Sequence, residues 1–208
     1  MTEVLYNLMS GTLLGFAAGV SPGPLLALVI SETLTHGRRE GMLVSMAPAL
    51  TDVPIIAISI FIISRISGFD FLLGMISLAG AFFVGHLAYR NMVLRDVNAQ
   101  LGSEKSRSLR RGLITNFLSP HPYLFWMTVG APTVMKAYRM NFFAALAFLA
   151  GFYLFLIGSK ILVALLVNSS RNFLRGGAYR IVIRATGIIM LFFALLLLRD
   201  GLIMLRLI

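Results

Sequence analysis

Six long apolar runs, separated by short polar connections, dominate the sequence. They cover about residues 4–30, 42–63, 69–90, 112–135, 142–167 and 179–198. A helix needs about 20 mainly apolar residues to cross a bilayer, and each run meets that length. The pattern therefore predicts six transmembrane helices. The first run has no basic segment before it and is too long for a signal-peptide core, so we expect it to remain in the mature protein.

The composition agrees with a membrane protein. Hydrophobic residues make up 58% of the chain and charged residues 12%, and the mean hydropathy is +0.88. An ordinary soluble protein carries roughly 25% charged residues, so this chain could not cover a soluble surface of its size. The expected fold class is an all-α membrane protein. Cysteine is absent and no two histidines are spaced i, i+4. Disulfide frameworks, cysteine nucleophiles and the usual zinc-hydrolase motif are therefore excluded, and we expect no metal site and no cofactor.

The basic residues that give the net charge of +10 lie between the apolar runs. Their positions predict how the chain is oriented in the membrane, and we expect no binding of nucleic acid. With both termini outside, the cytoplasmic connections hold twelve Lys and Arg residues and the external segments hold five. The positive-inside rule therefore predicts both termini outside. A basic cytoplasmic loop at 93–110 would divide the chain into a first three-helix repeat at 1–92 and a second at 111–208. We expect this loop to be solvated and to contact anionic lipid headgroups.

A short motif occurs twice. Ser-Pro-Gly-Pro at 21–24 in the first span returns 98 residues later as Ser-Pro-His-Pro at 119–122 in the fourth span. Because each half holds three helices, the second half must enter the membrane in the opposite orientation. Such inverted-topology repeats are a common plan of secondary transporters. The pattern predicts two inverted three-helix repeats.

The prolines of the two motifs predict that helices 1 and 4 are broken at Pro-x-Pro. Each proline lacks an amide hydrogen and displaces the carbonyl of the preceding turn. Main-chain groups freed in hydrocarbon would cost several kcal/mol, so they must face protein or a wet cavity. Half-helix termini carry partial charges of opposite sign, which complement a zwitterion such as an amino acid. The alternative is that these prolines only kink the helices for packing.

Two ionisable residues lie within predicted spans, Asp52 in the second and Lys160 in the fifth. A charged side chain at such depth costs about 2.5–3.5 kcal/mol on insertion scales and usually faces an interior cavity or a partner. Both residues are expected at a similar depth. We therefore predict that Asp52 faces a central pathway, and a pair with Lys160 is a further hypothesis. Asp52 would couple protons or anchor an ammonium group; the alternative is a structural pair or a cap near Pro54.

Other polar and small residues have less specific interpretations. His121 could shuttle a proton, because histidine titrates near neutral pH, or it could be a satisfied polar residue in a kink. Glu32 is expected to be interfacial and solvated. Lys160 could also extend its stem to the cytoplasmic interface. A stripe of glycines at positions 11, 15 and 19 predicts close helix packing, within one chain or between protomers.

These motifs resemble a known family. Residues 15–30 resemble the first-helix signature of the lysine exporter (LysE/RhtB) family, and Gly-Arg-Arg-Glu-Gly at 37–41 looks like its first cytoplasmic turn. Residues 116–120, followed by Leu-Phe-Trp at 124–126, are similar to its second motif. That motif usually reads Asn-Pro-Lys, whereas here Ser-Pro-His-Pro stands in its place. The resemblance implies a small exporter of amino acids and related metabolites in the inner membrane of a bacterium or archaeon, driven by protons and often dimeric.

The sequence therefore predicts a secondary active exporter of amino acids or related small polar metabolites, coupled to protons, and not an enzyme. A non-transporting membrane scaffold or lipid-binding protein is the alternative. The expected partners are a small solute, protons, membrane lipids and, from the resemblance, a second copy of the chain. The candidate substrate-binding or pathway residues are Ser21, Pro22, Gly23, Pro24, Asp52, Asn116, Ser119, Pro120, His121 and Pro122. The proton-coupling candidates are Asp52, His121 and Lys160.

Overall fold

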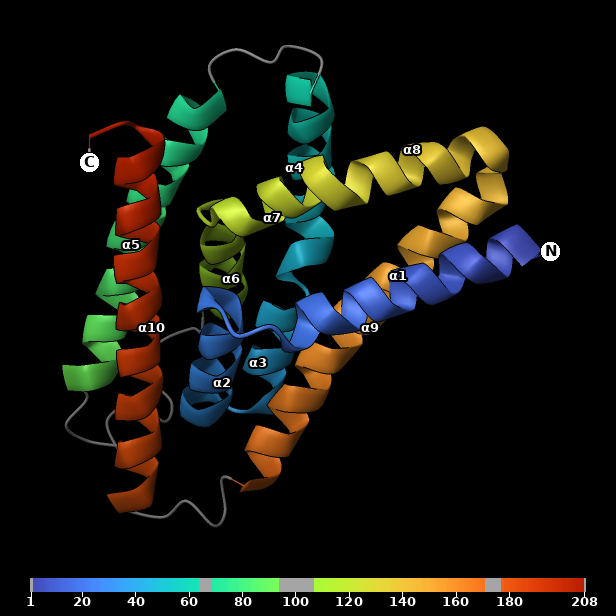
Figure 1. Cartoon of the computed structure of the whole chain (residues 1–208). Helices are drawn as coiled ribbons and strands as arrows, with labels where there is room; N and C mark the ends of the chain where they lie inside the picture. The colour runs from blue at the N-terminus through green and yellow to red at the C-terminus, as the bar shows by residue number, and fades with distance from the viewer. Residues whose placement is uncertain (1, 64–68, 94–106, 171–176, 208) are drawn as a thin grey trace.

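The computed structural model describes residues 2–63, 69–93, 107–170 and 177–207, and these residues form helices and no strand (Figure 1). In chain order the elements are α1 (Thr2–Val20), α2 (Pro24–His36), α3 (Arg38–Ser45), α4 (Ala47–Ile63), α5 (Phe69–Val93), α6 (Ser108–Phe117), α7 (Pro120–Phe125), the π-helical turn η1 (Trp126–Gly130), α8 (Ala131–Met140), α9 (Phe142–Ser170) and α10 (Gly177–Met204). The all-helical class is confirmed. Most of the predicted basic loop at 93–110 lies outside the described residues.

Several helices are long and apolar enough to cross a membrane. Within the described residues these are Arg38–Ser59, Phe142–Ser169 and Arg184–Met204. The pair α1 and α2 meets the same test when it is taken as one span bent by 64°. Of the remaining predicted spans, 69–90 falls on α5 and 112–135 is divided among α6, α7, η1 and α8. The chain is thus a membrane protein whose described residues contain three or four candidate spans, and the six-span inverted repeat stays a prediction.

Two long helix pairs frame the molecule. α1 packs along α9, and α5 packs along α10, while α2, α3 and α6 lie between the two pairs (Figure 1). Apolar side chains of α2, α5 and α10 form the largest buried cluster, which includes Leu28, Val84, Met190 and Leu197. Since α2 sits at the centre of these contacts, the point where it begins is held firmly between both pairs.

The predicted glycine stripe packs inside this chain. Gly11, Gly15 and Gly19 are buried on α1. A Cβ atom added at Gly11 or Gly15 would overlap the main-chain carbonyl of Phe148 or Phe152 on α9. Without side chains in between, the two backbones approach closely, as expected for helices in lipid. Of the two interpretations, contact within one chain is therefore confirmed for this stripe.

Both predicted helix breaks are present. α1 ends at Val20 and α2 begins at Pro24, and between them Gly23 is extended, with φ −173° and ψ 175°. α6 ends at Phe117 and α7 begins at Pro120 after an extended Ser119. In each case a proline occupies the first position of the new helix, where its missing N–H would have had no intrahelical partner.

Candidate functional site

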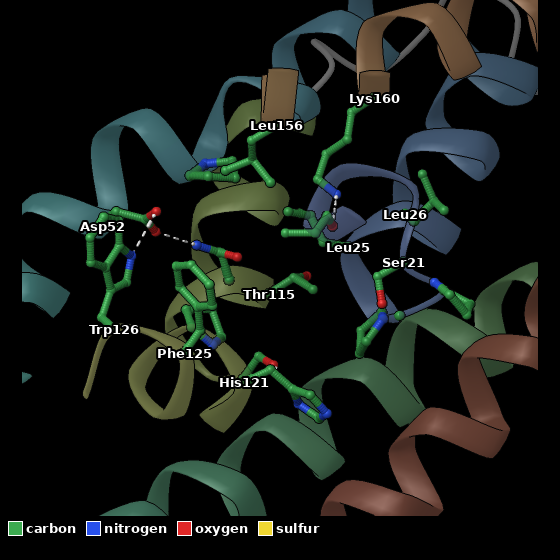
Figure 2. A pocket seen from close by; sticks show the side chains of 18 of the residues that line it. Ser21, Leu25, Leu26, Asp52, Thr115, His121, Phe125, Trp126, Leu156 and Lys160 are labelled. Atoms are coloured by element: carbon green, nitrogen blue, oxygen red, sulfur yellow. Dashed lines mark hydrogen bonds between the residues drawn. The ribbon is translucent and has the colours of Figure 1, made fainter. Parts of the chain in front are cut away.

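A cavity of about 200 Å³ lies where the two broken helices meet (Figure 2). Residues of both motifs line it, together with side chains from α4, α6, α9 and α10. The candidate residues Ser21, Pro22, Gly23, Pro24, Asp52, Asn116, Ser119, His121, Pro122 and Lys160 all belong to the lining. Pro120 is buried and does not line the cavity. The structure therefore brings together candidates from four separate stretches of the chain.

Asp52 lies at one side of the cavity, 3% exposed, and accepts hydrogen bonds from three side chains. Trp126 donates from Nε1 to Oδ2 over 3.1 Å, and Tyr153 donates from its hydroxyl to the same oxygen over 3.2 Å. Asn116 donates from Nδ2 to Oδ1 over 3.3 Å. A carboxylate without its proton can only accept, so these three donors form a cradle for the ionised form. The cradle joins α4 to α6, η1 and α9.

Asn116 and Trp126 owe their positions to the second broken helix. The Asn116 amide also donates to the Thr51 hydroxyl over 2.6 Å, which fixes α6 against α4. Trp126 is the first residue of the π-helical turn that follows α7, and its ring packs so closely on Gly130 that a Cβ there would collide with it. π-helical turns occur often at functional sites because they change the direction in which side chains point.

Lys160 does not pair with Asp52. No ion pair is found between these two described residues, and the Lys160 ammonium instead donates to the main-chain carbonyls of Gly19, over 2.9 Å, and Ala18, over 3.4 Å. Pro22 stands four residues after Ala18 and has no N–H, and Gly23 stands four residues after Gly19 and lies outside the helix. The break therefore leaves the carbonyls of Ala18 and Gly19 without donors from α1. The hypothesis of a direct pair was wrong because the broken end of α1 provides closer acceptors. Lys160 thus caps the C-terminus of α1 from α9.

Two carbonyls at the second break are bonded by neighbouring residues. The Tyr123 hydroxyl donates to the Phe117 carbonyl over 3.1 Å, and the Ser119 amide donates to the Asn116 carbonyl over 3.3 Å. His121 is exposed at the cavity, and its Nδ1 lies 3.4 Å from the Ser119 hydroxyl. Both donors lie within six residues of the carbonyls that they bond.

Apolar side chains close the rest of the cavity. The rings of Phe125 and Phe152 stack with centroids 5.0 Å apart, and Trp126 meets Phe152 edge to face at 5.4 Å. Leu156 and Phe193 also belong to the apolar part of the lining. The site therefore combines a few polar groups with apolar walls, as small-molecule sites usually do.

Sequence reasoning did not identify Trp126, Tyr153 or Thr115 as site residues, although all three contact Asp52 or line the cavity. A signal for the first was present, because Trp126 is the chain's single tryptophan and an indole N–H that is buried usually finds an acceptor. Tyr153 and Lys160 are seven residues apart on α9 and so share a helix face. Nothing in the sequence distinguished Thr115 from other threonines.

A second polar cluster lies nearer the C-terminal end of α2. Glu32 is 4% exposed. It accepts from Arg111 Nη1 over 2.7 Å and from the Ser108 hydroxyl, both on α6, and it lies 2.9 Å from His36 Nδ1. The expectation that Glu32 is solvated at an interface was wrong, because α6 supplies the counterion and the hydrogen bonds that a buried carboxylate requires. The cluster ties α2 to α6 outside the cavity.

The comparison with protein families identifies one family. The sequence profile of the LysE type translocator family matches residues 16–201. No curated protein and no solved structure matches the chain. The matched range includes both helix breaks, Asp52 and Lys160, so the family assignment covers every part of the cavity.

Proposed function

Because the chain belongs to the LysE type translocator family, it is a small-molecule transporter and not an enzyme, and we propose that it exports amino acids or related small polar metabolites across the inner membrane in exchange for protons. The observation that carries this proposal is the cavity between the two broken helices, with the buried carboxylate of Asp52 at its wall. Its volume of about 200 Å³ lies below the roughly 300–1,000 Å³ of sites for drug-sized ligands. A small metabolite suits it.

The Asp52 cradle supports a role in proton coupling. An indole N–H only donates, whereas a tyrosine hydroxyl can donate or accept. A proton on Oδ2 would therefore make that oxygen a weaker acceptor for Trp126, while Tyr153 could turn its hydroxyl and accept from the new O–H. Protonation of Asp52 would weaken the bond to Trp126, which is one of the ties between α4 and the second broken helix. In the proposed cycle an external proton neutralises Asp52, the cavity opens inward, and the proton leaves as the solute enters.

The proposed architecture is the six-span inverted repeat, with repeats at 1–92 and 111–208 joined by the basic loop at 93–110. Both termini lie outside, the loop contacts anionic lipid, and the working assembly is a homodimer. The sharing of one cavity by the two Pro-x-Pro motifs supports this arrangement, since transporters with inverted repeats bind their substrates at the repeat interface.

The alternative of a non-transporting scaffold or lipid-binding protein required the two proline motifs to be kinks in tightly filled packing. They border a cavity with polar groups instead, and the family is one of transporters. We therefore do not carry this alternative further.

The test is efflux from proteoliposomes that contain the purified full chain, loaded with the common amino acids under an imposed pH gradient. We expect the wild type to release a subset of them faster when the outside is acidic. Asp52→Asn keeps an acceptor oxygen but cannot exchange a proton, so we expect at least a roughly tenfold lower efflux and no response to the gradient.

A matched control is Asp200→Asn, at the far C-terminal part of α10 and outside the cavity lining, which should behave like the wild type. If Asp52→Asn transports at the wild-type rate with the wild-type pH response, Asp52 is not the coupling group. If the wild type releases no amino acid under any gradient, the proposed substrate class is wrong.

A further inference from the structure

The N-terminus of α2 forms one wall of the cavity, and its first main-chain donors have no partner within the described residues. The Ala27 amide bonds the Gly23 carbonyl over 3.0 Å, and Pro24 has no amide hydrogen. The amides of Leu25 and Leu26 lie between Pro24 and Ala27, in the first turn, where a helix provides no acceptor of its own. No side chain caps this end of the helix. Gly23, Pro24, Leu25 and Leu26 all line the cavity.

Thr115 provides an independent sign that a ligand binds here. Its hydroxyl is buried, with the residue 1% exposed, and it has no hydrogen-bond partner in the described structure although it lines the cavity. Threonines on other helices behave differently, because Thr33, Thr51 and Thr133 each donate to the carbonyl four residues earlier. A buried hydroxyl without a partner costs roughly 1–3 kcal/mol, and the Thr115 side chain projects from α6 toward the space between Asp52 and Leu25 (Figure 2).

The charges around the cavity are separated. Asp52 lies at one side, and Leu25, Leu26 and Lys160 lie at the other, with Thr115 between them (Figure 2). The positive end of the α2 dipole and the Lys160 ammonium both favour an anion on their side. Lys160 lines the cavity while its ammonium group caps α1. It therefore adds positive charge on this side of the cavity, although its hydrogen bonds go to α1.

We propose that the amides of Leu25 and Leu26 and the hydroxyl of Thr115 form a subsite for the carboxylate of the transported solute, whose ammonium group then faces Asp52. This inference rests on the proposed function and narrows it. The solutes accepted must carry a free carboxylate, and amines or amides of the same side chain are rejected. A carboxylate offers two acceptor oxygens to the three donors, whereas a primary amide has one acceptor oxygen and would place its NH₂ group against a donor.

The experiment uses proteoliposomes loaded with an equal mixture of the common amino acids or with the matching C-terminal amides, and protein-free liposomes correct for leakage. We expect the wild type to release amino acids and retain amides. Thr115→Val keeps the shape but removes the hydroxyl, so it should reduce amino-acid efflux at low concentration roughly tenfold. Thr115→Ser should restore most of it. Thr133→Val, whose hydroxyl lies outside the cavity, is the matched control and should leave efflux unchanged.

Stability without solute separates a binding role from a structural one. Because the Thr115 hydroxyl has no partner in the protein, Thr115→Val should unfold at the same temperature as the wild type or higher. A lower unfolding temperature would overturn the subsite, as would equal export of amides or wild-type efflux in Thr115→Val. If the wild type releases neither amino acids nor amides, the proposed function fails together with the subsite. Amino-acid efflux that is insensitive to Thr115 overturns the subsite alone.

Discussion

The two proline breaks have nearly the same sequence and different surroundings. At the first break, a lysine from a distant helix caps the open carbonyls of α1, and the first amides of α2 are left facing the cavity. At the second, the neighbouring Tyr123 and Ser119 bond the carbonyls of Phe117 and Asn116, and prolines at the first and third positions of α7 remove two of its first four donors. The first break therefore contributes the amides of two lining residues of α2, Leu25 and Leu26, whereas the first turn of α7 contributes the amide of one, His121.

The two breaks therefore suit different tasks in the proposed function. The first break offers hydrogen-bond donors to a ligand and depends on Lys160 for its shape. The second break supports the side chains that hold Asp52, because Asn116 comes just before it and Trp126 just after it. In the proposed inverted repeat, the first half would then bind the solute and the second would couple the proton.

The largest effect is expected when the cap that Lys160 provides to the C-terminus of α1 is removed. Lys160→Met keeps the length of the side chain and removes the donors, so the buried carbonyls of Ala18 and Gly19 lose their partner. Each unsatisfied buried group costs about 1–3 kcal/mol. We expect a clear drop in the unfolding temperature in detergent and a loss of efflux, since α1 would no longer end at a fixed place beside the cavity.

The matched control is Lys136→Met, at an exposed position of α8, which should leave both measurements unchanged. A Lys160→Met protein as stable and as active as the wild type would mean that the first break does not depend on its cap.

A smaller effect is expected at the second break. Tyr123→Phe removes the one side-chain hydrogen bond to the Phe117 carbonyl, which is worth about 0.5–1.5 kcal/mol. Because the Ser119 amide still caps the neighbouring carbonyl, the unfolding temperature should fall slightly and efflux should persist. Tyr138→Phe, at an exposed residue of α8, serves as the control. A transport loss as large as that of Lys160→Met would show that the two breaks are equally sensitive and would remove the asymmetry.

Local features of the sequence were sufficient to place both breaks. Proline cannot donate to a helix wherever it stands, so the positions 21–24 and 119–122 were predictable without tertiary information. Asp52 was recognisable for a similar reason, because a carboxylate in an apolar run is costly in any fold.

The partners of these groups were not predictable from the sequence. Depth along separate helices suggested that Asp52 meets Lys160, but depth does not fix rotation about a helix axis or the distance between helices. The structure turns Lys160 toward the end of α1 and surrounds Asp52 with Trp126 and Tyr153. Glu32 shows the same limit, since only the packing of α6 on α2 brings Arg111 to it.

The most direct test of the account asks whether both breaks face water inside the membrane. The chain has no cysteine, so single substitutions Ser21→Cys and His121→Cys, one at each break, can be labelled in proteoliposomes with a charged thiol reagent that does not cross lipid. Phe192→Cys, an exposed apolar position on α10, is the control for a site outside the cavity. The account predicts labelling at both breaks, slowed by transported amino acids, and none at Phe192→Cys. Break positions that resist the reagent as Phe192→Cys does, or that react at the same rate with and without solute, would contradict a translocation site between the broken helices.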